Sequence, residues 1–128
     1  MSFIESAEFT GDYLNIRFSD SLTMTDDKLD ELWDLLAAMS TKYDCLRTLI
    51  EAESPVCGLD TTAAFDSGVK VSGIGAGMQL ALCFRNYEMG ESSEFFRTVA
   101  LNRGVRVEYF DNKEKALQWL GVRSASAG

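Results

Sequence analysis

The sequence predicts one α/β domain with a single mixed, mainly parallel sheet of four or five strands, an N-terminal β-hairpin and about four helices packed on the sheet. Two observations carry this fold class. Apolar residues alternate around a glycine turn at the start of the chain, which is typical of a hairpin. Short apolar runs then alternate with segments of helical periodicity, which indicates parallel strands joined by helices. The 128 residues fit one domain at 1–122, followed by a short tail at 123–128.

The hairpin is expected within residues 3–18. Leu14, Ile16 and Phe18 alternate with polar or aromatic residues after the turn at Thr10-Gly11-Asp12. Alternation of this kind on both sides of a glycine-containing turn favours two antiparallel strands. We therefore expect the hairpin to supply an antiparallel strand at the edge of the sheet.

The middle of the chain predicts two helices around a buried strand. Thr25 is the expected N-cap of the first helix, and acidic residues follow in its first turn. The apolar stripe of this helix consists of Leu29, Leu32, Trp33, Leu36 and Met39. Residues 45–52 form an apolar run typical of a buried strand. Asp60 is placed to cap a second helix from Thr61 to about Ser72.

A second buried strand is expected at residues 78–84, followed by a third helix. Ser92 or Ser93 is the expected cap of that helix, and Gly104 follows its end at a position suited to a left-handed residue. The residues expected to point inward are Phe95, Phe96, Val99 and Ala100.

The last strand is expected near residues 105–109, where apolar residues alternate. Asp111 and Glu114 have the spacing of a capping box, which predicts that Asp111 caps a final helix. The buried side of that helix is formed by Ala116, Leu117, Trp119 and Leu120.

Composition excludes several classes of function. The chain has 12 basic and 20 acidic residues, a net charge of −8 and a pI of about 4.4. We therefore expect neither nucleic acid nor an anionic membrane as a partner. There is no histidine, which excludes Ser-His and Cys-His nucleophiles and zinc held by histidine. We expect no metal and no cofactor.

The three cysteines fit neither a disulfide framework nor a zinc site. Cys45 and Cys83 lie in apolar runs and are expected in the core, whereas Cys57 lies in a loop. The first residues lack a basic and apolar leader, and no apolar run reaches the roughly 18 residues of a membrane span. We expect a cytoplasmic protein with reduced thiols.

The order of elements, the acidic first turn of the first helix and the closing residues 103–120 resemble a known group. The stretch Val105–Leu120, which ends in Ala-Leu-Gln-Trp-Leu, is similar to the ending of bacterial STAS-like proteins related to the anti-sigma-factor antagonist SpoIIAA. The resemblance implies a SpoIIAA-like fold over nearly the whole chain. It also implies a non-enzymatic regulatory or protein-interaction domain, with a protein partner that the sequence does not identify.

One functional mark of that group is missing. STAS-like regulators carry an Asp-Ser-Ser-Gly type of turn with a phosphorylatable serine before a helix. The corresponding residues 53–62 read Glu-Ser-Pro-Val-Cys-Gly-Leu-Asp-Thr-Thr, which lacks this motif. Ser54 and Thr61 are the hydroxyl residues in the same region, and they are the candidates for phosphorylation.

A small-molecule binding domain for a nucleotide, an anion or an acyl compound is the alternative function. Ligands of open α/β sheets bind outside the carboxyl ends of the strands, near a switch point in strand order. Hydroxyl, amide and guanidinium groups at these ends favour phosphate or carboxylate. The candidate residues are Ser54, Asp60, Thr61, Thr62, Arg85, Tyr87, Ser92 and Ser93. The same residue types also serve simply as helix caps.

Two further interpretations stay open. Glu51 and Glu53 stand two residues apart on a strand, so they form either an acid–base or Mg²⁺ pair or two solvated carboxylates. The glycine-rich residues 73–77 precede a strand instead of a helix, which favours a connection over a phosphate loop. An exposed sheet edge or apolar helix face would also permit a homodimer.

Overall fold

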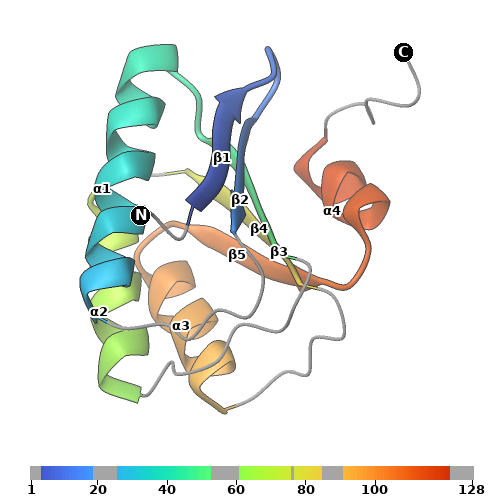
Figure 1. The fold of residues 1–128 in the computed structure, drawn as a ribbon. Coiled ribbons are helices and arrows are strands. Elements are labelled where there is room, and N and C mark those ends of the chain that lie inside the picture. The colour runs from blue at the N-terminus through green and yellow to red at the C-terminus, as the bar shows by residue number, and fades with distance from the viewer. Residues whose placement is uncertain (1–3, 19–25, 53–60, 76, 85–90, 122–128) are drawn as a thin grey trace.

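The structure is a computed structural model that describes residues 4–18, 26–52, 61–75, 77–84 and 91–121. These residues form a five-stranded mixed sheet and four helices, which confirms the predicted α/β class and the N-terminal hairpin (Figure 1). The strands are β1 (Ile4–Phe9), β2 (Leu14–Phe18), β3 (Arg47–Ala52), β4 (Gln79–Phe84) and β5 (Arg106–Phe110). The helices are α1 (Asp26–Tyr43), α2 (Thr61–Ser72), α3 (Glu91–Asn102) and α4 (Lys113–Leu120). None of these helices is long and apolar enough to cross a bilayer.

The strands lie side by side in the order in which the chain makes them. β1 is antiparallel to β2, and β2, β3, β4 and β5 are parallel to one another. Every crossover moves one strand further in the same direction, and crossovers of one hand put their helices on one face of a sheet. Figure 1 shows α1, α2 and α3 on one face and α4 on the other.

This strand order corrects one expectation about binding. A switch point arises where neighbouring crossovers leave in opposite directions. The order from β1 to β5 does not reverse, so these five strands do not form the switch point at which a ligand crevice is expected.

The larger core lies between the sheet and α1, α2 and α3. β2 contributes Leu14, Ile16 and Phe18, each of which is at most 1% exposed. Trp33 of α1 stacks on Phe96 of α3 with their ring centroids 5.9 Å apart. The predicted apolar stripe of α1 is buried along its whole length. This core joins all three helices to the same face of the sheet.

A smaller core lies under α4 on the opposite face. Ala116, Leu117 and Leu120 of α4 are buried there, as the sequence predicts. They join a cluster formed with Leu49, Ala81 and Cys83 of the sheet and Tyr13 of the turn before β2. Because α4 packs on β3, β4 and β5, both faces of β4 are covered, as its continuous apolar run predicts.

Two residues predicted in the core are only partly buried. Cys45 packs at the margin of the larger core, whereas Cys83 is buried as predicted. Trp119 lies at the margin of the smaller core, where its ring meets that of Phe110 at a centroid distance of 5.8 Å. Cys45 lies in the loop between α1 and β3, and Trp119 is the next-to-last residue of α4. At these positions fewer neighbouring elements cover a side chain.

The cap of α4 is Asn112, so the prediction of Asp111 is wrong. The Asn112 side-chain oxygen accepts a hydrogen bond from the N–H of Lys115 at 3.2 Å. Asn112 has an extended backbone with φ −141°, the conformation that lets a cap side chain reach the amide three residues later. Asp111 stands one residue too early for this contact.

The start of α3 also differs from the prediction. The helix begins at Glu91, so Ser92 and Ser93 lie within its first turn instead of capping it. The expected caps Thr25 and Asp60 lie outside the described residues.

Helices α2 and α3 approach closely at Gly68. A Cβ atom placed there would lie 2.6 Å from Cγ1 and 2.9 Å from Cβ of Val99. Both distances are shorter than a van der Waals contact, so this position of α2 has no room for a side chain. The glycine therefore sets the distance between the two helices.

We predict that Gly68→Ala destabilises the domain by about 1–3 kcal/mol, because the added methyl group overpacks the contact with Val99. Alanine favours a helix over glycine by about 1 kcal/mol, and the cost of overpacking at Val99 must exceed this gain. Chemical denaturation gives the free energy of unfolding. Gly73→Ala is the matched control, since its Cβ would meet its nearest atom, the carbonyl oxygen of Lys70, at 3.4 Å. An equal loss from both variants would contradict close packing at Gly68.

Candidate functional site

The candidate ligand residues divide into two groups. Four fall outside the described residues: Ser54, Asp60, Arg85 and Tyr87. The other four belong to the first turns of two neighbouring helices: Thr61, Thr62, Ser92 and Ser93. Because α2 and α3 follow parallel strands and pack together, their backbones bring these two pairs to the same edge of the sheet. Ligand binding by this group and phosphorylation of Ser54 or Thr61 stay predictions.

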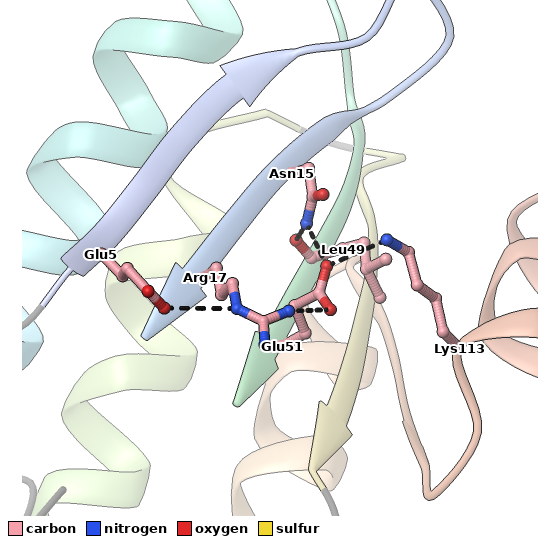
Figure 2. A network of polar contacts seen from close by, with 6 residues as sticks. All are labelled: Glu5, Asn15, Arg17, Leu49, Glu51 and Lys113. Atoms are coloured by element: carbon pink, nitrogen blue, oxygen red, sulfur yellow. Dashed lines mark hydrogen bonds and ion pairs between the residues drawn. The ribbon is translucent and has the colours of Figure 1, made fainter. Parts of the chain in front are cut away.

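The described polar side chains converge most densely on Glu51, near the end of β3 (Figure 2). Its Oε1 accepts a hydrogen bond from Nη1 of Arg17 at 3.0 Å. Its Oε2 accepts from Nδ2 of Asn15 at 2.9 Å and lies 3.3 Å from Nζ of Lys113. The Glu51 side chain is only 12% exposed. We call Glu51 with Asn15, Arg17 and Lys113 the Glu51 cluster.

The Glu51 cluster joins separate elements of the fold. Asn15 and Arg17 come from β2, Glu51 from β3 and Lys113 from the first residue of α4. Arg17 also reaches Glu5 of β1, with 3.2 Å between Nε and Oε2. Figure 2 shows these groups lying across the sheet beside α4. The carboxylate therefore links the start of α4 to β2 and β3.

This arrangement favours a structural role for Glu51. Both of its oxygens already accept from side chains, and two of those side chains are cations that repel a metal ion. Glu53, its proposed partner, lies outside the described residues. No three of the acidic and cysteine side chains in the described ranges gather in a way that would hold a metal ion.

Sequence reasoning did not find the partners of Glu51. Asn15 and Arg17 stand two apart on β2, as do Leu49 and Glu51 on β3, and the parallel register pairs Arg17 with Glu51. The matching two-residue spacings are present in the sequence, but they predict a contact only when β2 and β3 are known to be neighbours. Lys113 reaches Glu51 because α4 packs back onto the sheet, and the sequence pattern does not predict that packing.

Two ionisable groups lie next to the Glu51 cluster. Burial raises the pKa of the Cys83 thiol, and the negative charge of Glu51 on the neighbouring strand raises it further. Burial likewise raises the pKa of Tyr13, against the opposing charge of Lys113. Both groups are therefore protonated near neutral pH, and a protonated buried thiol is a poor nucleophile.

A pair of exposed phenyl rings lies on the outer side of α2 and α3. Phe65 is 43% exposed and Phe95 is 37% exposed. Their ring centroids are 6.4 Å apart and their planes differ by 25°, so the rings stack. The prediction that Phe95 points inward is wrong, because Phe96 takes the inward position at 3% exposure. We call Phe65 and Phe95 the aromatic pair.

We predict that Glu51→Gln lowers the free energy of unfolding by about 1–3 kcal/mol, since it leaves two cations without their shared, nearly buried anion. Urea denaturation measures the change. Glu5→Gln is the matched control, because Glu5 contacts the same Arg17 but its side chain is 58% exposed. That variant is expected within about 0.5 kcal/mol of the parent. Equal losses of unfolding free energy in the two variants would show that burial does not strengthen the contribution of Glu51 to stability.

Comparison with known proteins identifies the fold. No protein-family model matches the sequence, and neither does any curated protein sequence. Among solved structures, the chain is similar to an uncharacterized protein of the DUF3478 family from Shewanella loihica PV-4, which has a SpoIIAA-like fold. The two chains are 24% identical, the match covers 91% of each, and the TM-score is 0.51. The chain has a SpoIIAA-like fold, as its closing residues predict.

Proposed function

We propose that this chain is a non-enzymatic, cytoplasmic regulatory domain that works by binding another protein across α2 and α3. The observation that carries the proposal is the aromatic pair. Two large apolar side chains stacked in solvent offer contact area of the kind that dominates protein interfaces. The resemblance to STAS-like regulators supports the same class of function.

The surroundings of the aromatic pair suggest the chemistry of the partner. Asp66 and Glu94 are exposed and adjoin Phe65 and Phe95 in the sequence. An apolar centre with a charged rim is the usual anatomy of a protein interface. The whole chain carries a net charge of −8, which attracts basic partners. We therefore expect a partner that presents an apolar side chain flanked by lysine or arginine.

The place of the aromatic pair also suggests how binding is regulated. Phe65 is the fifth residue of α2, one turn after Thr61, and Phe95 is the fifth residue of α3, two residues after Ser93. A phosphate on Thr61 would add close to two negative charges beside this surface. Phosphorylation at this edge would therefore change the affinity for the partner.

We predict that a photo-crosslinking residue placed at Phe65 captures one protein in extracts of the source organism, whereas the same residue at Leu101 does not. Leu101 is the control because it is 57% exposed on α3 and does not belong to the aromatic pair. The captured protein, once purified, is then titrated against the parent chain. Phe65→Ser and Phe95→Ser are expected to weaken binding at least about tenfold, the loss typical of a central anchor.

Equal binding by Phe65→Ser, Phe95→Ser and Leu101→Ser would overturn the proposed surface, provided that the three variants unfold at the same temperature.

Native mass spectrometry of the purified chain tests the alternative function. A small molecule that co-purifies and is lost on denaturation would replace protein binding by small-molecule binding as the leading function.

A further inference from the structure

Three polar side chains form a row across the sheet on the face that carries α4. Arg47 of β3 is in register with Gln79 of β4, and Gln79 is in register with Arg106 of β5. Backbone hydrogen bonds fix this register: the N–H of Gln79 donates to Leu46 and that of Arg106 donates to Met78, both at 2.9 Å. We call Arg47, Gln79 and Arg106 the arginine row.

The alternation of the strands places the arginine row on the α4 side. Arg47 stands two residues before Leu49, and Gln79 two before Ala81, and both of these apolar residues belong to the core under α4. Val107 of β5 and Val105 just before it point into the larger core, so Arg106 points the other way. Arg47 and Arg106 are nevertheless exposed. The row therefore lies on a part of this face that α4 leaves open.

No carboxylate among the described residues pairs with the arginines of this row. The two carboxylates of β3 and β5 on the same face have their own cations: Glu51 pairs with Arg17 and Lys113, and Glu108 pairs with Arg97 at 2.9 Å. Within the described part of the chain, no ion pair involves Arg47 or Arg106. Two free guanidinium groups thus flank one amide in a protein that is acidic overall.

We propose that the arginine row binds a phosphate group of a small molecule. Neighbouring strands are about 4.8 Å apart, so the Cα atoms of Arg47 and Arg106 are separated by roughly 10 Å. Two arginine side chains converge over such a distance, with the Gln79 amide as a donor between them. A carboxylate has two oxygens and is satisfied by one guanidinium. The three free oxygens of a phosphate monoester match two guanidinium forks and an amide.

Titration with inorganic phosphate and with glycerol phosphate, followed by NMR of backbone amides, tests the proposal. Saturable shifts are expected at Arg47, Gln79 and Arg106, and acetate at the same ionic strength is expected to produce none that saturate. Arg47→Gln and Arg106→Gln are each expected to weaken phosphate binding about tenfold, the loss of one charge-assisted hydrogen-bonded contact. Stronger binding of glycerol phosphate than of inorganic phosphate would identify an ester as the ligand; the reverse would identify the free ion.

Arg103→Gln is the matched control, because Arg103 is exposed in the turn before β5 and lies outside the row. It removes the same charge and is expected to change phosphate affinity less than twofold. Arg47→Lys keeps the charge but loses the fork, so it is expected to bind more weakly than the parent chain. Equal weakening by Arg103→Gln, or saturable binding of acetate at the same amides, would overturn the proposed site in favour of general charge attraction.

Discussion

The one-directional strand order is the constraint on which the rest of this structure depends. Among the described elements, it gathers α1, α2 and α3 on one face and leaves the other face to α4 (Figure 1). Five strands span roughly 19 Å from first to last. An eight-residue helix is about 12 Å long and about 10 Å wide, so it cannot cover that face. The nearly buried Glu51 cluster lies beside the start of α4, and the exposed arginines of the arginine row lie where α4 does not reach.

The two faces are consequently stabilised in different ways. The helical face is held by a large apolar core, whereas α4 rests on a few buried residues and on the contact between Lys113 and Glu51. A helix this short is not stable by itself in water, so its order depends on those contacts. The proposed protein surface and the proposed phosphate site lie on opposite faces, which allows them to be occupied at the same time.

Much of the fold is predictable from the sequence, because alternation, short apolar runs and helical periodicity mark the strands and helices. The closing residues predict the SpoIIAA-like fold that the solved structure supports. The cap of α4 is not predictable from spacing, since Asp111 and Asn112 are adjacent and have about equal capping ability. The Glu51 cluster and the arginine row were missed because they join residues from different strands. Their members become neighbours only once strand order and register are known.

Helix α4 is attached to the sheet as a separate unit, held in part by Glu51. Native-state hydrogen exchange of the parent chain and of Glu51→Gln tests it most directly. Amides of Leu117 and Leu120 are expected to exchange by a local opening of lower free energy than those at the centre of β4. Glu51→Gln is expected to lower the opening free energy of α4 more than that of β4. Equal opening energies for α4 and β4 in both proteins would contradict the claim, because α4 would then unfold only with the whole domain.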